Sequence, residues 1–117
     1  MIRAFLTALI ASLATNASAE IFRCEGDTPS WRLDLTGDNA TLQMIERLDL
    51  KLTQSTTAEG RDWPRAFTLE SKRDTTIALI ELGRCRTSRG VGPLRAHVMT
   101  QSGDAPILLT GCCWPVQ

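Results

Sequence analysis

Two adjacent cysteines near the C-terminus, Cys112 and Cys113, constrain the fold of this chain more than any other feature. The other two cysteines, Cys24 and Cys85, lie far from this pair in the sequence. Successive side chains of a β-strand point to opposite faces, so a strand through Cys112 and Cys113 can be bonded to two distant segments at once. A bond between the neighbours themselves would strain the peptide link that joins them. The sequence therefore predicts two disulfides from the C-terminal pair to the earlier cysteines, and leaves open which partner each one takes.

Such disulfides would contribute as much stability as the hydrophobic core. In the chain-entropy model, a bond from Cys85 to the C-terminal pair stabilises the chain by about 3.5 kcal/mol, and one from Cys24 by about 4.6 kcal/mol. The two loops overlap, so the values do not add. A core of this size supplies roughly 3–5 kcal/mol. We therefore expect folding of the domain to depend on its disulfides.

The first 19 residues have the three parts of an export signal. A positive start over residues 1–3 precedes an apolar run over residues 4–13, and residues 17–19 have the small-x-small pattern of a cleavage site. The apolar run is too short to span a bilayer, which takes roughly 20 residues. We expect a helical signal peptide over residues 1–19, removed by cleavage, and a single disulfide-stapled β domain over residues 20–117.

Charge and cysteine content set the compartment and exclude some partners. The chain has 13 basic and 13 acidic residues, and loss of Arg3 with the signal would leave a net charge near −1. This balance provides no field to attract nucleic acid or an anionic membrane. An even cysteine count in an exported chain is typical of an oxidising compartment. We expect a periplasmic or secreted monomer that binds no nucleic acid and, after cleavage, no membrane.

The chain from residue 21 onwards reads as short strands separated by turns. Trp31, Leu33 and Leu35 alternate with polar residues, which is the period of a half-buried strand. Helix formers make a helix the competing interpretation over residues 40–51, but the period of two favours strand. The prediction is an all-β fold, a small antiparallel barrel or sandwich of about eight strands. The expected strands cover residues 21–24, 31–36, 40–45, 48–53, 67–70, 75–82, 94–99 and 107–114.

Two polar stretches are expected to be surface loops. Residues 55–60 are small and polar, and residues 83–92 are rich in glycine and arginine and include Cys85. Four arginines within and just after the second stretch form a candidate site for an anion, such as a phosphate or carboxylate of a cell-envelope polymer. The other interpretation of the cluster is a solvated basic loop. The four residues are Arg84, Arg86, Arg89 and Arg95.

Several of these positions resemble a family of small exported bacterial proteins, often described as uncharacterised lipoproteins or membrane proteins. Members are similar in a C-x-G-x-E-P-F-W start, a C-x-D-x-M-S loop and a G-C-C or G-C end. The matching residues here are Cys24, Gly26, Pro29, Trp31, Cys85, Gly111, Cys112 and Cys113. The resemblance implies that Cys85 pairs with Cys112, which leaves Cys24 for Cys113.

The chain departs from this family at its most distinctive side chains. Thr28 stands in place of the usual glutamate and Ser30 in place of phenylalanine, and the loop after Cys85 has neither the aspartate nor the methionine. The start of the mature chain is also similar in style to periplasmic inhibitors of C-type lysozyme, without their internal serine-glycine motif. The resemblance therefore implies a scaffold and assigns no site residue at the departing positions.

The patterns of common catalytic and metal sites are missing from the sequence. A cysteine–histidine nucleophile at His97 would need a free thiol, zinc sites use cysteines two to four residues apart, and redox catalysis takes C-x-x-C. We expect no catalytic residue, metal or cofactor. The favoured function is a small periplasmic binding or inhibitory module for an unknown envelope protein or anionic polymer. The alternatives are an enzyme that uses His97 with an acid or a cysteine, and an envelope structural or stability factor.

Overall fold

The computed structural model describes residues 21–103 and 105–116, and these residues form an all-β fold. The predicted signal peptide over residues 1–19 lies outside the described residues. The strands are β1 (Ile21–Asp27), β2 (Ser30–Thr36), β3 (Asn39–Gln43), β4 (Arg47–Thr57), β5 (Arg65–Glu70), β6 (Asp74–Thr87), β7 (Gly90–Ser102) and β8 (Pro106–Pro115). Within the described ranges, no helix is long and apolar enough to cross a membrane.

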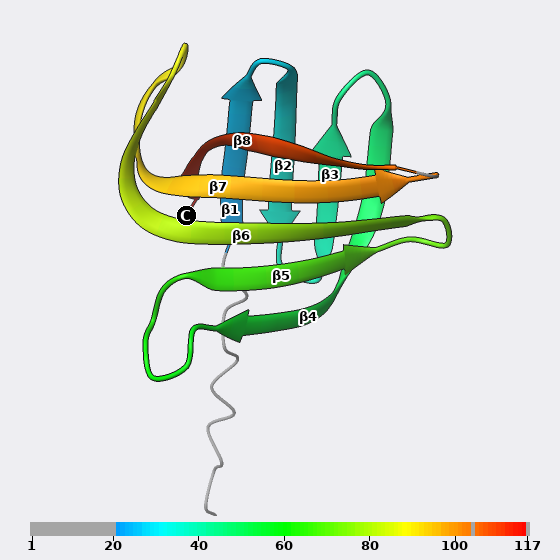
Figure 1. The fold of residues 1–117 in the computed structure, drawn as a ribbon, viewed down its shortest axis with the longest axis horizontal. Helices are drawn as coiled ribbons and strands as arrows, with labels where there is room; N and C mark the ends of the chain where they lie inside the picture. Colours follow the sequence, from blue (N-terminus) through cyan, green and yellow to red (C-terminus); the bar gives the residue numbers. More distant parts are fainter. Residues whose placement is uncertain (1–20, 104, 117) are drawn as a thin grey trace, which may run out of the picture.

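The strands close into an antiparallel barrel. Each strand pairs with the next one in the chain, and β8 pairs with β1. β1–β3 form one layer, and β5–β8 cross it in a second layer (Figure 1). β4 belongs to both layers, and a register shift between Leu52 and Gln54 marks the place where its pairing becomes irregular. Such bulges bend a strand and increase its twist. The closed barrel decides between the two architectures that the sequence left open.

The apolar residues of β2 and β3 point into the barrel, as the period of two predicts. Trp31, Leu33 and Leu35 of β2 are all buried, and Ala40 and Leu42 of β3 follow the same alternation. The strand interpretation is therefore confirmed over the helical one for residues 40–43 and 47–51. Most of the buried apolar residues form one cluster, so the closed sheet has a single core.

The Trp31 side chain occupies space that glycines of two neighbouring strands leave open. Its indole Nε1 donates a hydrogen bond of 3.0 Å to the Thr110 carbonyl of β8. A Cβ on Gly26 of β1 would overlap the indole nitrogen, and a Cβ on Gly111 would lie 2.8 Å from the ring. Glycine permits close approach of this kind because it has no side chain. The indole therefore packs directly over the seam where β1 and β8 close the barrel.

The expected boundaries are wrong in three places. The predicted loop over residues 83–92 is strand, because β6 continues to Thr87 and β7 begins at Gly90. The predicted loop over residues 55–60 begins only after Thr57, because Ser55–Thr57 pair with β5. The predicted strand over residues 40–45 ends at Gln43, because the chain turns there and the Met44 amide donates a hydrogen bond of 3.0 Å to the Glu46 carbonyl.

Both disulfides involve the C-terminal pair, whose side chains leave β8 on opposite faces. Cys113 bonds to Cys24 of β1 inside the barrel, and Cys112 bonds to Cys85 of β6. This is the pairing that the family resemblance implies. Two disulfides indicate an oxidising, extracytoplasmic environment.

Candidate functional site

The end of the β6–β7 hairpin crosses the outside of β8 and reaches β1. A register shift between Leu82 and Cys85 bends the hairpin, and its two-residue turn is followed by Gly90 with φ of 131°. Only glycine adopts such a backbone without strain. The Trp114 indole donates a hydrogen bond of 3.3 Å to the Val91 carbonyl, which fastens the returning strand to β8. We call residues 83–92 the hairpin tip.

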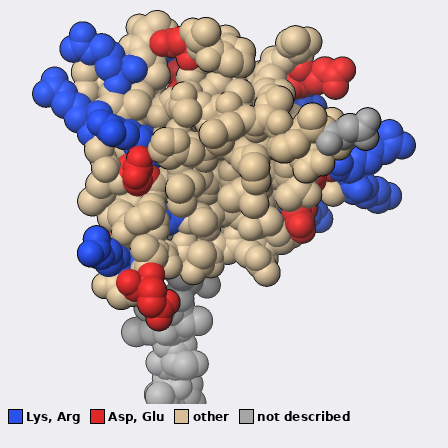
Figure 2. All heavy atoms as spheres, in the orientation of Figure 1, with Lys and Arg blue, Asp and Glu red and all other residues tan. Residues whose placement is uncertain are grey.

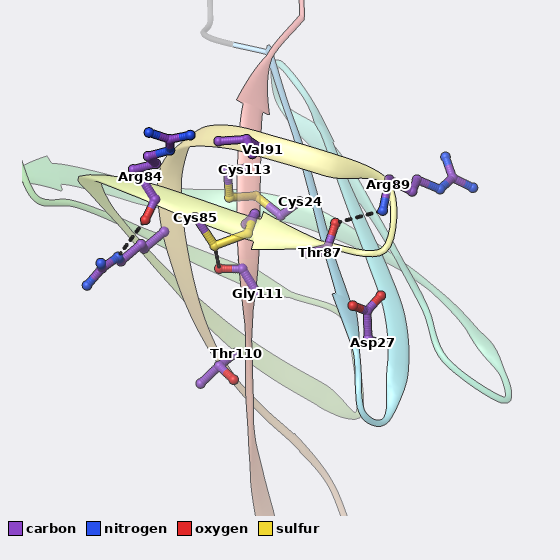
Figure 3. Close-up of a disulfide and its surroundings, with 12 residues drawn as sticks. Cys24, Asp27, Arg84, Cys85, Thr87, Arg89, Val91, Thr110, Gly111 and Cys113 are labelled. Atoms are coloured by element: carbon purple, nitrogen blue, oxygen red, sulfur yellow. Dashed lines mark hydrogen bonds between the residues drawn. A yellow bond between two sulfur atoms is a disulfide. The ribbon is translucent and has the colours of Figure 1, made fainter.

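The hairpin tip is held against β8 by a covalent bond. The Cys85–Cys112 disulfide joins it to β8, and Cys85 Sγ also lies 3.3 Å from the Gly111 carbonyl oxygen (Figure 3). Gly92 packs closely here, because a Cβ on it would lie 3.1 Å from the Cys113 carbonyl oxygen. The bond therefore fixes the bent end of the hairpin on a neighbouring strand.

Polar contacts fix the far end of the hairpin tip on β1. The Ser88 amide and hydroxyl each donate a hydrogen bond to the Asp27 carboxylate, at 2.9 and 2.8 Å. Arg89 Nε lies 3.1 Å from Glu25 Oε2, and the Glu25 side chain is only 10% exposed. A carboxylate this buried is stabilised by a paired cation. The hairpin tip is therefore tied down at two points, by sulfur on β8 and by carboxylates on β1.

The structure does not bring the four candidate arginines together. Arg84 and Arg89 point to opposite sides of the disulfide (Figure 3). Arg89 is paired with Glu25, and Arg95 Nε donates a hydrogen bond of 3.3 Å to the Arg84 carbonyl. Basic side chains do gather over the end of this hairpin, at the upper left of Figure 2. Two of the four, Arg86 and Arg95, line the same hollow.

This hollow, which we call the hairpin groove, lies beneath the hairpin tip and has a volume of about 340 Å³. It is open to solvent and has a mixed lining. The side chains that give it polar character come from β1, β6, β7, β8 and the β1–β2 turn: Asp27, Thr28, Arg86, Thr87, Arg95, His97 and Thr110. Two guanidinium groups and one carboxylate line the groove, which gives it a positive balance of charge. The Asp27 carboxylate also accepts two hydrogen bonds from Ser88. Guanidinium groups bind carboxylates and phosphates through paired hydrogen bonds.

His97 forms a second polar feature at this groove. Its Nε2 lies 3.0 Å from Glu81 Oε1, and both side chains are about 40% exposed. The pair forms across the outer face of β6 and β7. All four cysteines are in disulfides, so no thiol is available as a partner for His97.

Sequence reasoning found Arg86, Arg95 and His97 but missed the acids that accompany them. Glu81 becomes the neighbour of His97 only through the β6–β7 pairing, and Asp27 meets the hairpin tip only because that hairpin bends over β8. No local pattern marks either residue, since both depend on contacts between distant segments.

Comparisons with protein-family models, curated proteins and solved structures found no match to this chain.

Proposed function

We propose that this chain is a small periplasmic or secreted binding or inhibitory module without catalytic activity. The ligand is an anionic group, a carboxylate or a phosphate, carried by an envelope protein or polymer. The observation that carries the proposal is the hairpin groove, where Arg86 and Arg95 line one hollow beneath a covalently fixed hairpin. A fixed site loses little conformational entropy when it binds a ligand.

The two arginines of the groove have different roles in the proposed binding. Arg95 is partly engaged through its hydrogen bond to the Arg84 carbonyl, which orients its guanidinium group along the groove wall. Arg86 lies on the opposite strand of the hairpin and supplies a second cation. Thr28 and Thr110 add hydroxyl groups that both donate and accept hydrogen bonds. The proposed ligand is therefore a small anionic group with further polar atoms beside it.

Arg86→Ala tests the proposal, with Arg84→Ala as the matched control on the same strand. The oxidised chain is titrated with inorganic phosphate and with polyglutamate while backbone amide shifts are followed by NMR. We expect shifts around the groove, and a dissociation constant raised about tenfold by Arg86→Ala, the loss of one hydrogen bond to a charged group. Arg84 lies outside the groove lining, so its removal leaves the constant within about twofold.

Two outcomes would contradict this function. Equal weakening by both substitutions would show a diffuse charge effect, and shifts confined to another face would place binding elsewhere. Both variants keep the disulfides and the Arg89–Glu25 pair, so we expect both to fold. Comparison of their amide spectra with that of the unsubstituted chain distinguishes a folding defect from a loss of binding.

The His97–Glu81 pair supports a second candidate, an enzyme that uses the histidine as a general base. A carboxylate 3.0 Å from the ring orients a histidine for proton transfer. This candidate predicts that the chain hydrolyses a cell-envelope polymer and that His97→Ala removes the activity without weakening phosphate binding. Release of soluble fragments from purified envelope polymer, measured with and without the substitution, distinguishes it from a binding module.

A further inference from the structure

The second half of β4 has one free edge. β3 pairs with β4 only as far as Lys51, whereas β4 continues to Thr57 and pairs with β5 on its other side. No other strand among the described residues pairs with Thr53–Thr57. All five residues of this segment are exposed, so it extends beyond the core of the barrel. Figure 1 shows it as the outermost strand of the front layer. We call Thr53–Thr57 the free edge.

The free edge lacks two of the usual protections against pairing with another strand, and the bulge between Leu52 and Gln54 affects only its first residue. Its sequence, Thr-Gln-Ser-Thr-Thr, has no charged residue and no proline. Two hollows lie along it, of about 500 and about 390 Å³, and both are lined by Ser55 and Thr56. An exposed strand edge presents backbone amides and carbonyls to any strand that fits beside it. The backbone of the free edge is therefore open to pairing with one more strand.

We propose that the free edge pairs with the free edge of a second copy of this chain, in an antiparallel two-fold dimer centred on Ser55. This centre uses all five residues: Ser55 faces its own copy, Gln54 faces Thr56 and Thr53 faces Thr57. Each pair combines hydroxyl or amide groups, and such polar pairs stabilise a sheet when they lie opposite one another. A two-fold axis requires a segment that is complementary to itself, and this neutral segment meets that requirement.

Charge at the ends of the segment fits the same register. Lys51 precedes the free edge and Glu59 follows it, each four residues from Ser55. Antiparallel pairing about Ser55 puts Lys51 of each copy at the same end of the segment as Glu59 of the other, with Asn39 of β3 beside Lys51. After the expected loss of residues 1–19 each copy has a net charge near −1, so two copies approach with little net repulsion. The proposed dimer differs from the monomer that the sequence led us to expect.

The dimer leaves the hairpin groove open. The free edge lies at the bottom of the view in Figure 1, whereas the β6–β7 hairpin tip curves away at the upper left. No residue lines both the groove and the hollows along the free edge. Two copies would therefore present two grooves, and an anionic polymer could engage both at once. Self-association and anion binding are separate properties that fail independently.

Ser55→Lys tests the dimer, with Thr75→Lys as the control for added charge on another exposed strand position. Sedimentation equilibrium of the oxidised chain, from about 10 µM to about 1 mM, measures the dimer dissociation constant. We expect concentration-dependent dimerisation that Ser55→Lys weakens at least about fivefold, because two lysines would oppose each other at the axis. Thr75 lies on β6, away from the free edge, so its substitution leaves the constant unchanged.

A charge-swap mixture keeps the test independent of any folding defect. Ser55→Lys and Ser55→Glu place opposite charges at the axis, so their mixture forms a heterodimer more tightly than either variant forms its own dimer. Phosphate-induced amide shifts at the hairpin groove stay the same in both variants. A chain that is monomeric at about 1 mM, or a dimer that neither substitution affects, overturns the proposal.

Discussion

Gly111 shows how much the closure of the barrel depends on a single missing side chain. It lies next to Cys112 in β8, between the backbone of β1 and the Trp31 indole. A Cβ at this position would overlap the Glu25 carbonyl group, whose carbon would be 2.7 Å away. Neither the Glu25 backbone nor the Trp31 ring is the flexible end of a side chain, so neither can move aside without a large cost in free energy. The seam between β1 and β8 is therefore close-packed down to the backbone.

We expect Gly111→Ala to destabilise the chain by about 3 kcal/mol, the upper part of the range for overpacking a well-packed site. Urea unfolding of the oxidised chain, followed by tryptophan fluorescence, measures the change. Gly83→Ala is the matched control, because its Cβ would meet only the flexible Arg95 side chain, at 3.0 Å from Nε. We expect that control to cost less than about 1 kcal/mol. Equal losses would show that close packing at the seam is not the cause.

The β5–β6 turn contains a carboxylate with an altered pKa. Asp74 begins β6, and hydrogen bonds from the Ser102 and Ser71 side chains, with help from Arg73, lower its pKa below the ordinary value of 3.8. Ser71 Oγ lies 2.9 Å from the carboxylate, and its backbone amide donates to the Asp74 carbonyl at 3.0 Å. The ionised form of Asp74 therefore fastens the turn that joins two strands of the barrel.

The stabilisation by this turn should disappear in acid. Because the folded-state pKa is lowered, the stabilisation is complete above the unfolded value near 3.8 and is lost as the pH falls through the folded value. We expect Asp74→Asn to lower the melting temperature slightly at pH 7, by an amount that shrinks as the pH falls below 3.8 and through the folded-state pKa. Thermal unfolding of both chains across this range measures the difference. A difference that is independent of pH would exclude ionisation of Asp74 as its source.

The elements that could be predicted are those that local pattern decides. Alternation at Trp31, Leu33 and Leu35 predicts β2 because one face of a strand is buried wherever it lies. The hairpin tip could not be predicted in this way, since its glycines and arginines are typical of a loop. Its strand conformation depends on Cys112 and Asp27, which are distant in the sequence. The arginine cluster could be predicted from the sequence because its members lie close together in the chain. The sequence could not predict that Arg86 and Arg95 line the groove while Arg89 pairs with Glu25, because these positions depend on distant segments.

At the scale of the whole molecule, the two disulfides hold different parts of the fold. Cys24–Cys113 is buried in the seam that closes the barrel, and Cys85–Cys112 fastens one hairpin over that seam. Their sequence separations are 89 and 27 residues, and the longer loop constrains the unfolded chain more. The first bond therefore stabilises the barrel, while the second mainly orders the hairpin tip and the groove beneath it.

Paired alanine substitutions separate these roles. We expect removal of Cys24–Cys113 to cost about 4.6 kcal/mol and to unfold most of the barrel, and removal of Cys85–Cys112 to cost about 3.5 kcal/mol. In the second variant the barrel should remain, with faster amide hydrogen exchange concentrated in residues 83–92. Urea unfolding and hydrogen exchange together measure both effects. A larger loss on removal of Cys85–Cys112, or exchange spread evenly over the barrel, would contradict this division.

The position of Cys112 and Cys113 also sets the order in which the protein can mature. Synthesis proceeds from the N-terminus, so Cys24 and Cys85 exist before either of their partners has been made. Any bond formed between those two in the interval is absent from the finished structure and has to be exchanged. A chain cut short before residue 112 has no native disulfide available at all. Correct connectivity is thus a property of the complete polypeptide, and interrupted synthesis yields a product that oxidation can only mispair.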